Sequence, residues 1–158
     1  MKIFPTKTHS ITLITDSAAA ISELQKKTLS DDQFVADWNK QIFIGKINDS
    51  EFELKLSKKV YGAFCVIKGK LENKNGLLEV GITKNYKIVL IILLLYPLVG
   101  FVISLLTNGF KNSIELIFPT IMFILVLRLV FIEFGFRIIS KNGLNKLNEI
   151  IGIGMEKK

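Results

Sequence analysis

Two ionisable side chains stand inside a long apolar stretch of this sequence. Arg128 and Glu133 belong to residues 116–136 (LIFPTIMFILVLRLVFIEFGF), whose other members are almost all apolar. A charged side chain at the centre of a membrane helix costs roughly 2.5 to 3.5 kcal/mol on insertion scales, so such residues mark ion pairs, pore linings or structural contacts. Two interpretations stay open: both side chains snorkel toward the cytoplasmic headgroups, or they have a packing or pore role.

The other potentially reactive residues do not combine into a recognisable site. Ser10, His9 and Asp16 lie in one short strand-like segment without the turn of a nucleophile elbow. The acidic residues at 31–32 suit the first turn of a helix, where they interact favourably with its dipole, better than a cation site. A single cysteine, Cys65, and a single histidine are too few for a zinc site. We expect no catalytic residue, no metal site and no cofactor.

Two apolar runs organise the chain. Residues 88–106 (IVLIILLLYPLVGFVISLL) contain no charged side chain, and residues 116–136 follow after a short segment with polar residues. At about 1.5 Å per residue, each run is long enough to cross a hydrocarbon layer of roughly 30 Å as a helix. A hydrophobic content of 49% agrees with this interpretation. The sequence predicts a transmembrane helical hairpin over residues 87–136.

The flanking charges predict how the hairpin crosses the membrane. Lys84 and Lys87 precede the first run, and Arg137 and Lys141 follow the second, in a chain of net charge +7. Short flanks rich in lysine and arginine stay on the cytoplasmic side. We therefore expect a bacterial inner-membrane protein with both termini in the cytoplasm and residues 107–115 outside. The four flanking cations are expected to contact anionic lipid.

Arg128 has possible acceptors on the first apolar run. In an antiparallel helix pair it stands at the height of Tyr96, and the next residue, Pro97, leaves one backbone carbonyl without its helical donor. Glu133 is five residues from Arg128, which is about 140° round an α-helix. The sequence thus predicts that Arg128 caps the kink at Pro97 and does not pair with Glu133.

The residues before the hairpin predict a small cytoplasmic α+β domain, residues 1–86. A strand followed by a helix, with Ala18, Ile21 and Leu24 on the buried stripe of that helix, is expected to pack on a four-stranded antiparallel meander. The expected ranges are strands at 9–15, 41–47, 52–56, 60–70 and 77–83, and helices at 17–28 and 33–39.

The residues after the hairpin, 137–158, predict a cytoplasmic amphipathic tail. Leu144, Leu147 and Ile151 recur at helical spacing, so a helix is expected there. Its apolar side either packs on the sheet or lies along the inner membrane surface.

Residues 43–151 show a fixed order of elements. The first is a strand that contains Phe43 and Gly45 as F-x-G, followed by a turn, an alternating strand and an apolar strand that ends near Gly69. A two-helix hairpin and a charged tail follow directly. This order resembles that of a family of small, uncharacterised bacterial two-span inner-membrane proteins with a cytoplasmic β-meander domain. Residues 62–65 (GAFC) depart from it, since the family has Asn-Ser-Phe and proline there. The resemblance implies fold and location, and it transfers no catalytic residue.

Three functions remain open. The first is a non-enzymatic, membrane-anchored module whose cytoplasmic domain binds a protein partner or a small-molecule ligand, for instance as an immunity protein against a toxin. The second is a ligand-gated, oligomerising effector or channel, similar in layout to two-span effectors of cyclic-oligonucleotide phage defence. A membrane enzyme ranks last. We expect lipid contact, homo-oligomers in the second case, and no nucleic-acid partner, because the basic residues near Lys55 lack interleaved aromatics.

Overall fold

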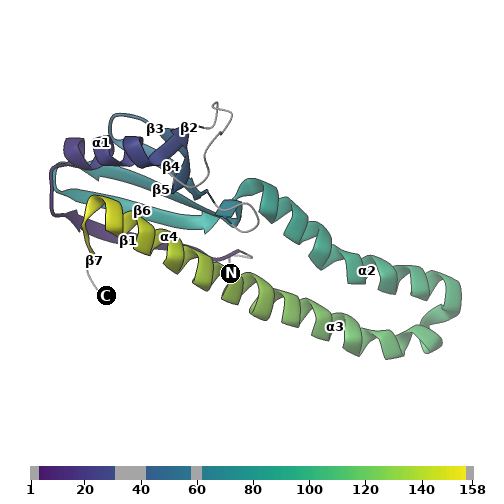
Figure 1. The fold of residues 1–158 in the computed structure, drawn as a ribbon. Helices are drawn as coiled ribbons and strands as arrows, with labels where there is room; N and C mark the ends of the chain where they lie inside the picture. The colour runs from purple at the N-terminus through teal and green to yellow at the C-terminus, as the bar shows by residue number, and fades with distance from the viewer. Residues whose placement is uncertain (1–3, 31–41, 58–61, 156–158) are drawn as a thin grey trace. The chain divides into compact units, whose positions relative to one another are not determined.

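The structure, a computed structural model, describes residues 4–30, 42–57 and 62–155 of the chain. These residues form a mixed α+β sheet structure and two long apolar helices, which confirms the predicted class at that level (Figure 1). The expected helix at 33–39 and the acidic residues at 31–32 lie outside the described ranges.

The chain divides into two compact units. The first combines Met1–Thr83 with Arg137–Lys158, and the second is Lys84–Phe136. The tail after the hairpin thus belongs to the same unit as the residues before it.

A seven-stranded sheet forms the first unit, with the strand order β2-β3-β4-β5-β6-β1-β7. Neighbouring strands are antiparallel, except that β2 runs parallel to β3. The expected sheet of four strands is therefore wrong in its size, because the amino-terminal strand and two short edge strands join the same sheet. The strands are β1 (Thr6–Leu13), β2 (Thr28–Ser30), β3 (Phe43–Ile47), β4 (Glu51–Leu56), β5 (Cys65–Glu72), β6 (Asn75–Ile82) and β7 (Ile153–Met155).

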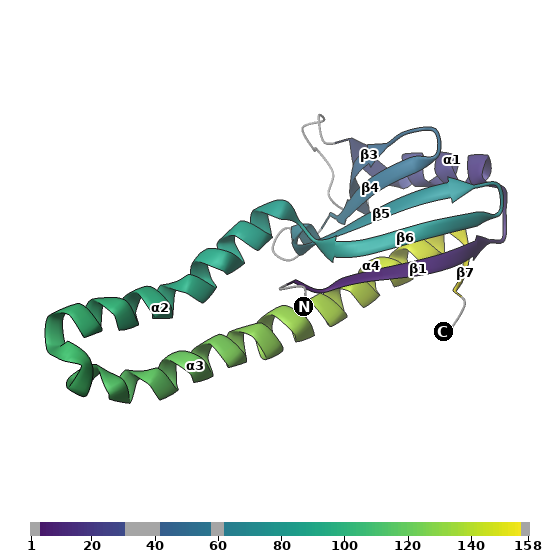
Figure 2. The same ribbon diagram turned by 180° about the vertical axis from the view of Figure 1, so that it is seen from behind.

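Alternating residues give the sheet one buried and one open face. In β4, Phe52 and Leu54 are buried whereas Glu51 and Glu53 are exposed, as the period of two in a strand requires. Figures 1 and 2 show α1 (Ser17–Lys27) and α4 (Gly135–Ile151) on the same face, and no described helix lies on the other. Among the described residues, no helix covers the face that carries the charges.

The first helix of this unit, α1, begins after Asp16 and buries Ala20, Ile21 and Leu24. The expected buried position Ala18 is wrong, since this residue is exposed. A buried stripe of residues 20, 21 and 24 fits the helical period as well as a stripe of residues 18, 21 and 24 does. The surface on which the helix packs determines which of the two stripes is buried.

Helix α4 packs on the sheet through Leu144, Leu147 and Ile151, all of which are buried. Its backbone comes close to β5 at Gly143, where an added Cβ would lie 3.0 Å from Cδ1 of Ile67. Of the two alternatives for the tail, the structure has the one in which the tail covers the sheet.

The second unit contains two apolar helical rods joined by a polar turn. The first rod is α2 (Lys84–Ser113), which contains Pro97 and breaks at Gly109 with a φ of 75°. After a single 3₁₀ turn, Ile114–Leu116, the second rod begins with α3 (Ile117–Val126). A π-helical segment, Leu127–Phe134, then leads into α4.

Polar side chains form hydrogen bonds near the turn between the rods. Ser113 is fully buried, and its hydroxyl lies 2.9 Å from the hydroxyl of Ser104. Asn108 donates to the same Ser104 hydroxyl at 3.3 Å, and Thr107 donates to the carbonyl of Ile103 at 3.0 Å. Of these bonds, the one between Ser104 and Ser113 spans the break at Gly109.

Both rods are long and apolar enough to cross a membrane, by length and composition. The stretches that meet this criterion are Lys84–Lys111 and Ile114–Ile151. In the apolar 18-residue stretch of the first helix 0% of the residues are buried, and in that of the second 6% are buried. A core helix of a soluble protein is mostly buried, so these helices do not resemble one.

Candidate functional site

Arg128 and Glu133 form an ion pair inside the second apolar rod. Nη1 of Arg128 donates to Oε2 of Glu133 at 3.3 Å, and their side chains are 24% and 29% exposed. Their neighbours Leu129, Val130 and Phe131 are apolar and exposed. Opposite charges in contact reduce the free energy needed to place either one in an apolar environment.

A π-helical turn brings the two residues together. The segment Leu127–Phe134 is π-helical, and the i→i+5 hydrogen bonding of a π-helix brings residues five positions apart closer to the same side than an α-helix does. The sequence-based expectation that Arg128 turns away from Glu133 is therefore wrong, because it assumed α-helical geometry. π-Helical turns are rare and frequently occur at functional sites.

Tyr96 and Pro97 do not take part in this arrangement. Helix α2 continues through Pro97, and the Tyr96 side chain is 73% exposed. Among the described residues, the hydrogen-bond partner of Arg128 is Glu133, not the carbonyl that Pro97 leaves without a donor.

The four expected lipid-contacting cations lie at helix ends. Lys84 begins α2 and Lys87 follows within its first turn, the first exposed and the second half-buried. Arg137 and Lys141 are four residues apart near the start of α4, and both are exposed. Each pair therefore lies within about one helical turn.

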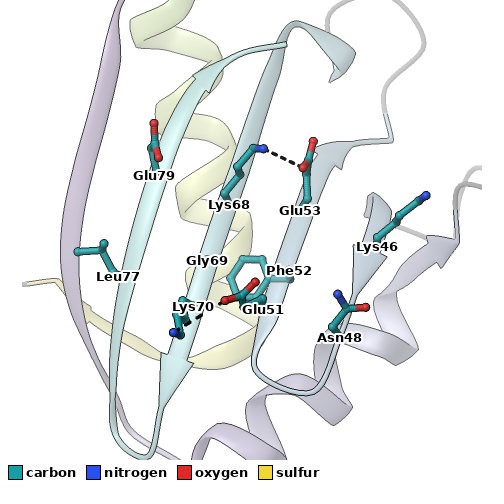
Figure 3. Close-up of a pocket in the computed structure, with 10 residues that line it drawn as sticks. All are labelled: Lys46, Asn48, Glu51, Phe52, Glu53, Lys68, Gly69, Lys70, Leu77 and Glu79. Carbon is teal, nitrogen blue, oxygen red and sulfur yellow. Dashed lines mark ion pairs between the residues drawn. The ribbon is translucent and has the colours of Figure 1, made fainter. Parts of the chain in front are cut away.

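The open face of the sheet contains a hollow of about 610 Å³, shown in Figure 3. Sequence reasoning missed this feature because it treated each strand separately. The detectable signal was the alternation of lysine and glutamate at positions that the strand pairing brings together. The hollow is lined by Lys46, Asn48, Glu51, Phe52, Glu53, Lys68, Gly69, Lys70, Leu77 and Glu79.

One row of side chains crosses four neighbouring strands with alternating charge. Lys46 of β3 pairs with Glu53 of β4, which pairs with Lys68 of β5, which pairs with Glu79 of β6. We call these four residues the charge row; Figure 3 shows them in sequence across the strands. The inner two form an ion pair, with Nζ of Lys68 3.0 Å from Oε2 of Glu53. Within the described ranges, the outer two, Lys46 and Glu79, have no ion-pair partner.

A second row lies next to the charge row on the same face. Glu51 pairs with Lys70 across β4 and β5, and Lys70 pairs with Leu77 across β5 and β6. Nζ of Lys70 is 3.9 Å from Glu51 and 3.3 Å from Glu72. Leu77 is 53% exposed, an apolar side chain on an otherwise charged surface.

Nucleophilic and metal-binding groups do not gather on this face. Cys65 is buried, and burial raises the pKa of its thiol to about 12, so it is protonated at neutral pH. Nε2 of His9 is buried and has no hydrogen-bond partner among the described residues. In the residues that the structure describes, no three histidine, cysteine or acidic side chains lie close enough to hold a metal ion. The face is equipped to recognise a surface that carries charges of both signs.

Comparisons of the chain with protein families, with curated proteins and with solved structures found no match. The sheet and two long apolar helices fit the layout of the resemblance described above only weakly.

Proposed function

We propose that this protein is a non-enzymatic, membrane-anchored binding module. The helical hairpin holds it in a bacterial inner membrane, and the sheet unit binds a partner from the cytoplasmic side. The observation that carries the proposal is the exposed apolar surface of both rods. In the apolar 18-residue stretch of each rod, only 0% and 6% of the residues are buried.

That surface is incompatible with water. Soluble monomers rarely expose contiguous apolar patches larger than about 600 Å². Here large apolar side chains are exposed along most of α2 and α3, including Ile92, Leu95, Val99 and Phe123. A hydrocarbon environment satisfies these side chains, and the intrahelical hydrogen bonds satisfy the backbone.

The orientation follows from the cations at the helix ends. Lys84 and Lys87 flank the first rod, and Arg137 and Lys141 flank the second. The positive-inside rule assigns such flanks to the cytoplasm, where they also contact anionic lipid. The turn that contains Gly109 then faces outward.

Membrane integration can be tested on the full chain in bacterial cells. We expect the protein to resist carbonate extraction and to float with lipid in a density gradient. Replacing Ile92, Leu95 and Val99 with lysine should release it or lead to its degradation, because three charges cannot cross the hydrocarbon. Lysine at the exposed positions Thr8, Ser10 and Asn75 of the sheet adds the same charge; it is the matched control and should leave the protein in the membrane. A parent chain extracted by carbonate contradicts the proposal.

The ion pair of Arg128 and Glu133 favours a second candidate function, an oligomerising effector or channel. The Arg128 and Glu133 side chains are 24% and 29% exposed among apolar neighbours, and assembly of several hairpins would enclose them in a pore. In that case purified protein in vesicles releases a small fluorescent anion, and Arg128→Leu abolishes the release. Vesicles that stay sealed at all protein densities leave the anchored module as the function.

A further inference from the structure

We propose that the open face of the sheet binds the same face of a second copy of this chain. The inference rests on the proposed function and names the partner of the module as the module itself. It is carried by the order of charges across strands β3 to β6.

The charge row is its own complement when reversed. From β3 to β6 it has the order Lys46, Glu53, Lys68, Glu79. A two-fold axis parallel to the strands, between β4 and β5, places this row opposite its own reverse, as in an isologous dimer. Lys46 then faces Glu79 of the second copy, and Glu53 faces Lys68 of the second copy. By symmetry, each contact occurs twice.

The dimer supplies partners to the two side chains that lack them. Lys46 and Glu79 are the ends of the row, and in the described part of the chain neither forms an ion pair. Three strand spacings separate them, about 14 Å, which is too far for a contact within one sheet. The two-fold operation brings both ends together with opposite charges.

The second row supports the same orientation. Around the same axis, Glu51 faces Lys70 of the second copy, so both rows are complementary. An axis perpendicular to the strands and midway between the rows would instead place Glu51 against Glu53, and Lys68 against Lys70. Because opposed like charges are unfavourable, the pattern selects one of the two face-to-face arrangements.

We expect the contact to be weak between free domains and stronger on a membrane. Exposed ion pairs contribute little individually and are screened by salt. Anchoring of both copies in one bilayer raises their effective concentration. Association should therefore depend on the number of protein molecules per lipid and should fall as salt is added.

Energy transfer between full-length chains tests this interface. Protein labelled at its amino terminus with a donor or an acceptor is reconstituted into phosphatidylcholine vesicles at a series of protein-to-lipid ratios. We expect transfer to rise with protein density for the parent chain. Lys46→Glu or Glu79→Lys alone should weaken association about tenfold, because each creates two like-charged contacts in the dimer. Lys74→Glu, an exposed change in the turn before β6, is the matched control and should leave transfer unchanged.

A mixture of the two variants provides the decisive measurement. A Lys46→Glu chain carries glutamate at both ends of the row, and a Glu79→Lys chain carries lysine at both ends. Neither should associate with itself, but the two should associate with each other and restore transfer. Since the ends cannot meet within one chain, this rescue can only come from contact between copies.

Three results would overturn the inference. They are a parent chain that shows no transfer at any density, single variants that associate as well as the parent, and a mixture that fails to recover. If the open face binds a different protein and the copies stay apart, no energy transfer is seen at any protein density. Flotation of the same vesicles reports on membrane integration separately, so failure of the dimer and failure of the proposed anchor are distinguishable.

Discussion

The guanidinium of Arg128 lies 3.3 Å from the carboxylate of Glu133, five residues later in the same helix. An α-helix would hold these side chains about 140° apart. The ion pair lies within the π-helical segment Leu127–Phe134. The wider turn aligns the charges, and their attraction stabilises a helical geometry that is otherwise rare.

Removing one member of this pair should destabilise the protein more than removing both. Glu133→Leu leaves the Arg128 charge among apolar side chains, and Arg128→Leu takes the ion pair from Glu133. We expect a loss of about 1 to 3 kcal/mol for each, reduced from the fully buried case by the partial exposure. The double leucine variant removes both charges and should recover most of that loss. Thermal unfolding in detergent measures all three. Single variants as stable as the parent would contradict a paired role.

This ion pair also shows why sequence reasoning reached its limit in the second unit. The two apolar runs are a local property of composition, so residues 88–106 and 116–136 could be located directly. The partner of Arg128 depends on whether the helix has 3.6 residues per turn at that point. Apolar residues on all sides leave no periodic pattern from which a π-helical turn could be recognised.

The sheet was underestimated for a different reason. Strands with alternating apolar and charged residues, such as β4, are visible one at a time. The short edge strands β2 and β7 have three residues each, too few to show a period. Strand β7 pairs with β1 from the opposite end of the chain, and only the folded structure reveals that pairing. The charge row was missed in the same way, because its order exists only across strands.

Cysteine labelling should place the turn of the hairpin outside and the sheet inside. In a Cys65→Ala chain, Lys111→Cys should react with a membrane-impermeant maleimide in spheroplasts. Lys74→Cys should react only after the membrane is permeabilised, because the flanking cations keep the sheet unit in the cytoplasm. Both positions are exposed, so accessibility within the fold does not limit either reaction. The reverse labelling pattern would invert the topology.

The ring of Phe52 occupies the space above Gly69 on the buried face of the sheet. A Cβ at Gly69 would lie 2.6 Å from Cε2 of that ring, well inside van der Waals contact. We expect Gly69→Ala to destabilise the protein by about 1 to 3 kcal/mol through overpacking. Gly81→Ala is the control, since its nearest neighbour, Cγ2 of Thr6, is 4.0 Å away. Equal melting temperatures for the two alanine variants would show that the ring does not constrain Gly69.

Alkylation of Cys65 should depend on pH in a way that reports its burial. The thiolate is the reactive form, and burial raises the pKa of this thiol from 9.0 to about 12. A raised pKa means less thiolate at any given pH, so the rate with iodoacetamide should rise about tenfold per pH unit from pH 8 to 11 without levelling off. Mass spectrometry of the full-length chain in detergent measures the rate. An exposed cysteine, Lys74→Cys in a Cys65→Ala chain, should level off near pH 9, as a thiol of ordinary pKa does. A similar plateau for Cys65 would show that the start of β5 is open to solvent, contrary to the packing in this structure.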